Sequence, residues 1–460
     1  MNARVLHTLE YDKIVDMLSL EAGSEEGAKK CRELVPETDV ELIRTAQQQT
    51  TDAVSRLRKK AGPYFGQLKD IRPQIMRLNI DAVLACEDLL DISSVLDVAA
   101  SAKRFLAPEN DETPVDSLSV FYDSLDPCSL LNNEVKRCII SFDEIADDAS
   151  AKLKDIRRRQ NFTKMQVQKT LSNMVTSPSM KLYLQDSVVT MRNGRYCIPV
   201  KQEHRSHVPG MVHDQSGSGS TVFIEPMAVV KLNNDLKELK IAEEEEIQVI
   251  LSHLSNMARQ VCENLKLDHD ILVELDFIFA KARFSEKLKA NPPVFNDDGY
   301  IELKRARHPL LNVKSAVPID AALGKDYEML IVTGPNTGGK TVSLKTTGLL
   351  CLMGQAGMHI PALDGSGLCV FKEIYADIGD EQSIEQSLST FSSHMKNIVE
   401  ILDKADADSL VLLDELCSGT DPAEGAALAQ AILSRLHMYG AKCMATTHYS
   451  ELKIFAMQSE

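Results

Sequence analysis

The stretch Glu328-Met-Leu-Ile-Val-Thr-Gly-Pro-Asn-Thr-Gly-Gly-Lys-Thr341 decides the fold of the last third of this 460-residue chain. Apolar residues run directly into Gly334, and Gly339-Lys340-Thr341 completes the spacing G-x-x-x-x-G-K-[ST]. This pattern is typical of a buried strand that turns sharply into a helix, with backbone N–H groups lining the turn. The start of a helix carries a partial positive charge, which favours phosphate. The stretch therefore predicts a polyphosphate-binding loop.

The residues of this loop are the predicted nucleotide ligands. They are Gly334, Pro335, Asn336, Thr337, Gly338, Gly339, Lys340 and Thr341. Lys340 is expected to reach the β- and γ-phosphates, and the Thr341 hydroxyl is expected to ligate Mg²⁺. A glycine-rich turn that serves only as a tight connection is the alternative.

Two further strands end in candidate catalytic residues. The apolar run Ser409–Leu413 ends in Asp414 and Glu415, which are expected to hold Mg²⁺ through water and to polarise the attacking water, respectively. The run that begins at Met444 ends in His448, which is placed to sense the γ-phosphate. The alternatives are a solvated acidic strand end and an ordinary loop histidine.

These strands belong to a larger alternating pattern that begins at Pro292. The candidate strands are Ile301–Lys304, Met329–Thr333, Leu368–Ile374, Leu410–Asp414 and Lys442–Thr446. Helical sequence follows most of them, which predicts an α/β domain with a largely parallel sheet.

The composition sets the class of protein. With 44% hydrophobic and 26% charged residues, the chain is typical of a soluble globular protein of several domains. No apolar run is long enough to span a membrane. The 10 scattered cysteines form no pair typical of a disulfide or zinc site, which favours a reducing, cytoplasmic location. The net charge of −16 means that any nucleic-acid contact must come from a local basic patch.

The middle of the chain predicts two long helices around a small β-rich segment. Residues 128–177 and 227–291 contain neither Gly nor Pro and could form helices of about 75 and about 95 Å. Between them, residues 179–226 contain the β-type runs Leu182–Val189, Tyr196–Val200 and Thr221–Ile224, with a hairpin signal at Asn193-Gly194. We expect an antiparallel helical arm with a β-rich tip. The run Glu243–Glu246 is interpreted as a solvated face.

This arm carries the basic patch that the net charge conceals. Its residues are Lys152, Lys154, Arg157, Arg158, Arg159, Lys164 and Lys169 in the first helix, opposed only by Asp155, and Arg192, Arg195, Lys201 and Arg205 in the tip. A basic helix can be merely solvated. Because this helix is combined with a basic tip, binding of a phosphate backbone is the other interpretation.

Four motifs resemble those of the MutS superfamily of ATPases. They are G-P-N-T-G-G-K-T at 334–341, S-T-F-S-S-H-M at 389–395, L-L-D-E-L-C-S-G-T-D-P at 412–422 and T-T-H at 446–448. The segments Val208–Ser216 and Phe223–Pro226, and a start without a mismatch-reading domain, are closest to the second bacterial MutS paralogue. Relatives of this type continue past Glu460 with more ATPase sequence and a nuclease-type domain, so we expect that this chain lacks those parts.

The resemblance implies a multidomain fold in five segments. These are a helical core (1–127), a first lever helix (128–178), a β-rich clamp (179–226), a second lever helix (227–291) and an ABC-type P-loop ATPase domain (292–460).

The resemblance also implies a Mg²⁺-dependent ATPase that acts as a homodimer through its ATPase domain. Ser389 and Thr390 would reach the γ-phosphate of the partner's ATP, and Val317 and Pro318 would pack near adenine. His394 is a departure, because repair proteins usually carry an acid there.

Three functions are consistent with this resemblance. The first is an ATP-gated clamp on branched DNA that suppresses homologous recombination without recognising mismatches. The second is a factor that grips collided ribosomes, through rRNA, and splits them with ATP. The third is an interaction module whose nucleotide site only stabilises the fold, and the intact Asp414-Glu415 pair argues against it.

Overall fold

The computed structural model describes residues 2–108, 115–312, 314, 316–334, 338–379 and 390–458. Its helices and sheets divide into two compact units. Unit 1 comprises Met1–Lys69, Val98–Asp126 and Leu267–Glu460, and unit 2 comprises Asp70–Asp97 and Pro127–Lys266. Among the described residues, none of the helices combines the length and the apolar character needed to cross a membrane.

Unit 1 is built on a parallel sheet. Its strands are β10 (Met329–Thr333), β14 (Lys442–Thr447), β13 (Ser409–Leu413) and β12 (Glu373–Asp377), which pair in that order. The predicted strands at 329–333, 410–414 and 442–446 are confirmed to within one residue. Since all four strands run the same way, their carboxyl ends lie at one edge of the sheet.

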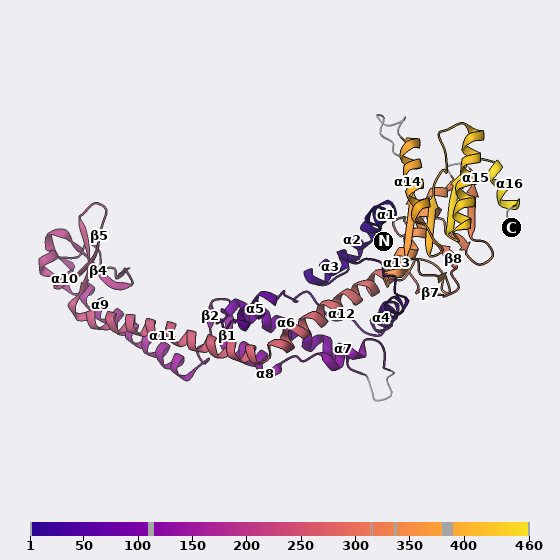
Figure 1. The fold of residues 1–460 in the computed structure, drawn as a ribbon. Helices are drawn as coiled ribbons and strands as arrows, with labels where there is room; N and C mark the ends of the chain where they lie inside the picture. The colour runs from indigo at the N-terminus through magenta and orange to yellow at the C-terminus, as the bar shows by residue number, and fades with distance from the viewer. Residues whose placement is uncertain are drawn as a thin grey trace. The chain divides into compact units, whose positions relative to one another are not determined.

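Helices cover both faces of this sheet. Successive strand residues point to opposite faces, so Leu410 and Leu412 pack with α13 (Lys340–Gln355), whereas Val411 and Leu413 pack in a second cluster. That second cluster includes residues of α14 (Thr390–Lys404), α15 (Pro422–Met438) and α16 (Glu451–Gln458). These three helices gather beside the strands in Figure 1. The sheet is therefore the middle layer of an α/β/α arrangement.

Unit 1 contains a second sheet, whose strand β11 (Gly367–Leu368) follows β10 of the first sheet in the chain. It contains β7 (Val294–Phe295), β11, β8 (Ile301–Ala306) and β9 (Ile319–Leu323), in that order. The prediction of one strand at 368–374 is wrong, because β11 and β12 belong to different sheets. The buried amide of Gln355 holds the chain between them, since its Oε1 accepts from Phe371 N and its Nε2 donates to Phe371 O.

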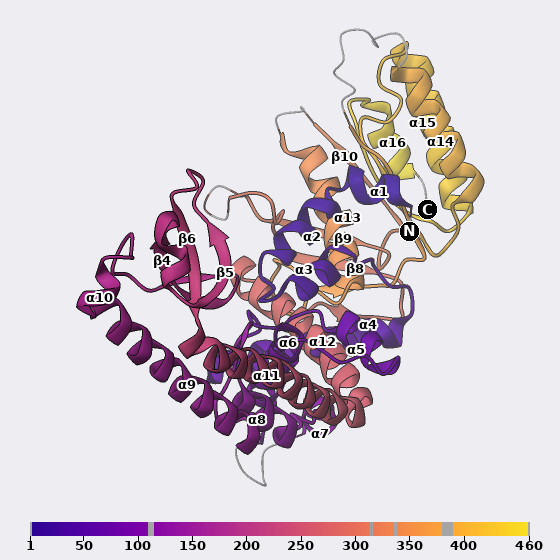
Figure 2. The same ribbon diagram turned by 90° about the vertical axis from the view of Figure 1, so that its left-hand side faces the viewer.

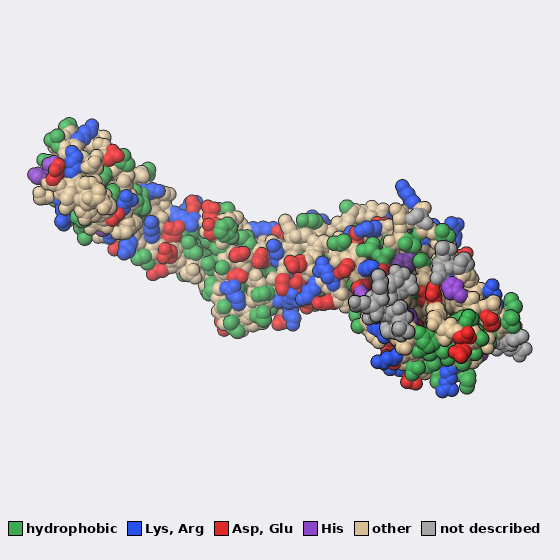
Figure 3. Space-filling model, turned by 90° about the horizontal axis from the view of Figure 1, so that it is seen from above, with side chains coloured by type: hydrophobic (Ala, Val, Ile, Leu, Met, Phe, Trp, Pro, Cys, Tyr) green, Lys and Arg blue, Asp and Glu red, His purple; other side chains and the backbone are tan. Residues whose placement is uncertain are grey.

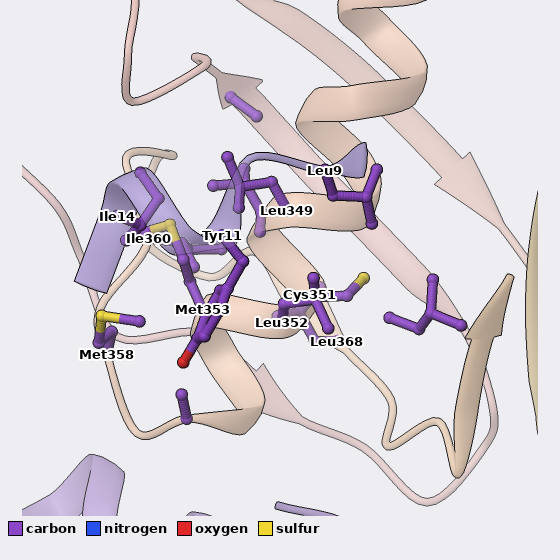
Figure 4. Close-up of a cluster of buried hydrophobic side chains, with 14 of the residues drawn as sticks. Leu9, Tyr11, Ile14, Leu349, Cys351, Leu352, Met353, Met358, Ile360 and Leu368 are labelled. Carbon is purple, nitrogen blue, oxygen red and sulfur yellow. The ribbon is translucent and has the colours of Figure 1, made fainter. Parts of the chain in front are cut away.

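The first three helices of the chain share their core with α13. They are α1 (Ala3–Thr8), α2 (Tyr11–Ser19) and α3 (Glu25–Arg32). The next helix, α4 (Val40–Lys59), contacts α13 through Gln47 Nε2, which donates to Gly354 O at 2.8 Å. Figure 4 shows Leu9, Tyr11 and Ile14 beside Leu349, Leu352 and Met353 of α13. Gly348 permits this approach, because a Cβ there would lie 2.9 Å from Leu9 Cδ1 and 2.5 Å from Leu412 Cδ1. Helices α1 and α2 therefore pack on the helix that follows the predicted phosphate-binding loop.

Four more helices lie in unit 1, in unit 2 or in both. They are α5 (Arg72–Asn79) in unit 2, α7 (Ser119–Ser124) in unit 1, and α6 (Cys86–Leu106) and α12 (Cys262–Leu288), which each contribute residues to both units.

Unit 2 contains two long helices that pack along each other, α9 (Ala151–Thr176) and α11 (Met227–Gln260). An antiparallel sheet lies at one end of this pair (Figures 1 and 2), with the order β3 (Thr190–Arg192), β4 (Arg195–Lys201), β6 (Thr221–Pro226) and β5 (Gly210–Gln215). Val167 and Leu171 of α9 and Val229 of α11 share a core with β4 and β6. The short helices α10 (Pro178–Lys181) and η1 (Gln202–His207) connect these elements.

The long helices are shorter than their sequence allowed. Residues 128–177 form α8 (Ser129–Cys138), a hairpin of β1 (Ile139–Ser141) and β2 (Glu144–Ile145), and then α9, whose first turn is capped by Ser150. Residues 227–291 form α11 and α12, separated at Val261. The prediction of unbroken helices is wrong at both places, because the absence of Gly and Pro permits a long helix without requiring one.

The β-rich segment was predicted in part. Asn193 and Gly194 turn between β3 and β4 with φ of 51° and 74°, which confirms the hairpin. The run at 182–189 is not a strand; only Leu184 makes an isolated bridge, to Val200. β5 was not predicted, since its residues are mostly exposed and lack a β-type pattern.

Candidate active site

The predicted catalytic residues meet at the carboxyl edge of the parallel sheet. Gly334 follows β10, Asp414 and Glu415 follow β13, and His448 follows β14. In the register of the sheet, Thr333 lies beside Thr447 and Leu413 lies beside Ala445, so the three strands end close together.

The described part of the loop has the expected conformation. Gly334 and Gly339 have φ of 147° and 79°, in a region that favours glycine, and Lys340 begins α13. The Lys340 side chain is buried with its Nζ donating to Gly334 O at 2.7 Å and lying 3.5 Å from His448 Nε2. A Cβ added at Gly334, Gly338 or Gly339 would meet no atom of the described residues within 4 Å, their chain neighbours aside. Pro335, Asn336 and Thr337 lie outside the described residues.

The Asp414 carboxylate joins three segments of the site. Its Oδ2 accepts from the Thr341 hydroxyl at 2.6 Å, and its Oδ1 accepts from the Thr446 hydroxyl at 2.5 Å. Its backbone N–H donates to Asp377 O at the end of β12, at 2.8 Å. The two predicted metal-binding residues, Thr341 and Asp414, are therefore in direct contact.

Glu415 is held in an unusual backbone conformation. Its φ is 48°, which is uncommon for a residue with a Cβ and is found at sites whose surroundings enforce it. Its N–H donates to Thr446 Oγ1 at 2.8 Å, and its Oε1 lies 3.6 Å from His448 Nε2. His448 is thus close to both Lys340 and Glu415.

Two residues of this site were not predicted from the sequence to have a role in it. Thr446, in the T-T-H motif, bonds both Asp414 and Glu415. Asp377 extends β12 beyond the predicted strand end, and its carboxylate accepts from Asn397 Nδ2 and contacts His394 Nδ1, each at 2.8 Å. The T-T-H motif could have pointed to Thr446, whereas no feature of the neighbouring sequence predicts the pairing of His394 with Asp377.

The remaining predicted ligands stay predictions. Val317, 82% exposed, and Pro318 lie just before β9 of the second sheet. Ser389 lies outside the described residues, and Thr390 begins α14. Within the described ranges, no group of three or more His, Cys, Asp or Glu side chains could hold a metal ion.

The basic helix of unit 2 is more neutralised than its sequence indicates. Arg157 bonds Glu243 at 2.7 Å and Asp147 at 2.6 Å, and Lys152 lies 2.9 Å from Glu246. The prediction that only Asp155 opposes these cations is therefore wrong. The predicted solvated face at Glu243–Glu246 is confirmed for the exposed Glu244 and Glu245 and is wrong for Glu246, which is buried and accepts from Ser150 Oγ at the start of α9. Figure 3 shows the acidic and basic side chains interleaved along this part of the chain.

Two arginines of the tip are also paired. Arg195 and His213 both contact Glu225, which is 0% exposed, and Arg192 lies 3.1 Å from Asp214. Of the predicted basic patch, Lys154, Arg159, Lys164, Lys169 and Arg205 are exposed side chains for which no ion pair is described.

Comparisons with known proteins agree with this site. Residues 330–460 match the family model described as MutS domain V. Proteins named "Endonuclease MutS2" are similar along the chain: that of Agathobacter rectalis is 55% identical and that of Lachnoclostridium phytofermentans 54%, each over 100% of this chain, and that of a Geobacillus species is 49% identical over 99%. The chain spans 58% of the length of each of these relatives. It therefore belongs to the MutS superfamily, and along its whole length its sequence is of the MutS2 type.

Proposed function

We propose that the chain binds and hydrolyses ATP with Mg²⁺ and couples this reaction to the binding of nucleic acid by unit 2. The single observation that carries the proposal is the cluster of Lys340, Thr341, Asp414, Glu415 and His448 at one edge of the parallel sheet. These side chains come from three separate segments of the chain, and a purely structural connection would not need to gather them.

The side chains of the site fit a bound Mg²⁺. Mg²⁺ prefers oxygen ligands and commonly takes only one or two from protein, with phosphate and water supplying the rest. The Thr341 hydroxyl and the Asp414 carboxylate, 2.6 Å apart, are such oxygens. These two residues would hold the ion, which supplies neutralisation of charge on the β- and γ-phosphates.

The other residues have separable roles. Lys340 would leave Gly334 O to pair with the phosphates, because a charged phosphate oxygen is a stronger acceptor than a neutral carbonyl. Glu415 would orient and deprotonate the attacking water, and His448, 3.6 Å away, would hold the Glu415 carboxylate and contact the γ-phosphate.

By its resemblance to the superfamily, the complete site would be formed between two copies, with Ser389 and Thr390 reaching the partner's ATP. The nucleic acid we propose is branched DNA, bound without sequence specificity to restrain recombination. The collided ribosome is the alternative target, since rRNA offers the same phosphates.

A retention assay tests these targets. Immobilised wild-type protein and its Glu415→Gln variant are offered a four-way DNA junction, a linear duplex of equal length, and ribosomes, with ATP and with ADP. Nucleotide-dependent retention of the junction above the duplex is expected. Retention of ribosomes without DNA would establish the alternative target. Retention of none of the three, or retention that ignores the nucleotide, would overturn the proposed coupling.

A further inference from the structure

Unit 2 contains a pocket that the proposed ATPase mechanism does not use. It has a volume of about 330 Å³ and lies where α9, α11 and the turn between β3 and β4 meet. Its lining comes from Gln160, Asn161 and Lys164 of α9, Met191, Asn193, Gly194, Arg195 and Tyr196 of the hairpin, and Leu236, Lys237 and Lys240 of α11. This volume is within the usual range for small-molecule sites.

The charge of the pocket has one sign. Lys164, Lys237 and Lys240 line it together with Arg195, and no Asp or Glu side chain does. The guanidinium of Arg195 is fixed by Glu225 at 2.9 Å and by Asn234 Oδ1 at 2.7 Å. The three lysines are exposed side chains with no described ion pair, although acidic residues neutralise several neighbouring cations. The pocket therefore gathers around one cavity three exposed lysines for which no ion pair is described.

The remaining lining combines amide groups with an apolar wall. Gln160 is held in place, because its Nε2 donates to Leu239 O at 3.1 Å and to Glu243 Oε2 at 2.7 Å. Asn193 Nδ2 donates to His213 O at 2.9 Å, which steadies the turn. Met191, Tyr196 and Leu236 supply apolar surface. Side-chain amides recognise the edges of bases, lysines recognise phosphate, and flat apolar surfaces receive an unstacked base.

We propose that this pocket binds one unpaired nucleotide of a nucleic-acid strand, with its phosphate on Lys237, Lys240 and Lys164 and its base against the Tyr196 and Met191 wall. The proposal deepens the proposed function and rests on it, because it names the place where unit 2 engages nucleic acid. It also gives a physical reason for a preference for branched or distorted strands, since a continuous duplex offers no free base.

The experiment measures binding of a fluorescent single-stranded hexanucleotide with a 5′-hydroxyl, by anisotropy over a range of salt concentrations. Mg²⁺ and saturating ADP are present, so that the phosphate-binding loop does not compete. A second probe has the same phosphates without bases. The pocket variant is Lys237→Gln with Lys240→Gln. The control is Lys154→Gln with Lys231→Gln, which removes the same charge from exposed positions of the same two helices outside the pocket.

The wild type is expected to bind the hexanucleotide more tightly than the abasic probe. The pocket variant should lose about tenfold in affinity, and its slope of log affinity against log salt should fall by roughly 1.4, as for two lost phosphate contacts on a single strand. The control should change little. If the two double variants are weakened equally, or if the two probes bind with equal affinity, the proposed nucleotide pocket is wrong, whereas the proposal that unit 2 binds nucleic acid still stands. A wild type that binds neither probe would count against the proposed function as well.

Discussion

The Thr446 hydroxyl donates a 2.5 Å hydrogen bond to Asp414 Oδ1 and ties the end of β14 to the end of β13. The same oxygen accepts from Glu415 N at 2.8 Å. One threonine thus positions both the proposed metal-binding carboxylate and the proposed catalytic one. Its hydroxyl does not need to touch ATP to control the geometry of hydrolysis.

Thr446→Val should therefore slow hydrolysis without abolishing nucleotide binding. The change keeps the shape of the side chain but removes both hydrogen bonds, and loss of such a supporting contact typically costs about 10–100-fold in activity. Steady-state phosphate release and titration with a fluorescent ATP analogue measure the two effects. Thr446→Ser, which retains the hydroxyl, should recover most of the rate. An unchanged rate in Thr446→Val would show that Asp414 and Glu415 hold their positions unaided.

Lys340→Met should abolish measurable nucleotide binding. The substitution removes the ammonium group that lies at the Gly334 carbonyl and close to His448. Charge-assisted bonds to phosphate are worth roughly 1.5–3 kcal/mol each, and this lysine is expected to make more than one. The fluorescent-analogue titration should show no saturable binding, with an unaltered circular dichroism spectrum as the folding control. Wild-type affinity would contradict the phosphate-binding assignment of residues 334–341.

Glu415→Gln should bind ATP normally and fail to hydrolyse it. The amide keeps the size of the side chain but cannot accept a proton from water, and general bases contribute typically about 10²–10⁴-fold. Single-turnover phosphate release measures the chemical step directly. Thr446 still fixes the backbone of residue 415 in this variant, so a normal rate would reassign the base to another group.

Two neighbouring arginines of α9 should behave differently. Arg157→Glu places a carboxylate against Glu243 and Asp147, in a partly buried ion pair. It should lower the free energy of unfolding by about 1–3 kcal/mol, below the cost of breaking a fully buried pair. Arg159→Glu, at an exposed position with no described pair, should leave thermal stability unchanged and weaken nucleic-acid binding. Thermal unfolding and salt-dependent anisotropy separate the two effects, and identical behaviour of both variants would contradict the described pairing.

The stability of unit 1 should decline as the pH rises through neutrality. Burial raises the pKa of Asp268 to about 7 from an ordinary value of 3.8, and its buried Oδ2 finds no hydrogen-bond partner among the described residues. The folded chain therefore holds a proton that the unfolded chain releases between about pH 4 and 7, so stability is lost as pH rises across this window. Asp268→Asn retains an oxygen that can accept from Asp126 N and cannot ionise. It should raise the melting temperature at pH 8 more than at pH 5, whereas an equal shift at both values would show that Asp268 does not titrate there.

Local sequence by itself determined the strands of the proposed nucleotide site and the turns at their carboxyl ends. The apolar run at 329–333, the glycines at 334 and 339, and the acidic end of the strand at 409–413 each specify a strand or a turn through neighbouring residues alone. The superfamily, too, was evident from these motifs and their spacing.

Only the tertiary structure decided which groups meet across the chain. It paired Thr446 with Asp414, His394 with Asp377 and Arg157 with Glu243, and it divided the Gly- and Pro-free stretches into separate helices. Hydrogen bonds, ion pairs and burial depend on distance in space, and residues 86 positions apart, as Arg157 and Glu243 are, carry no local signal of their contact. For the same reason, the charge of the basic helix could be counted from sequence, whereas the part of it left free for a ligand could not.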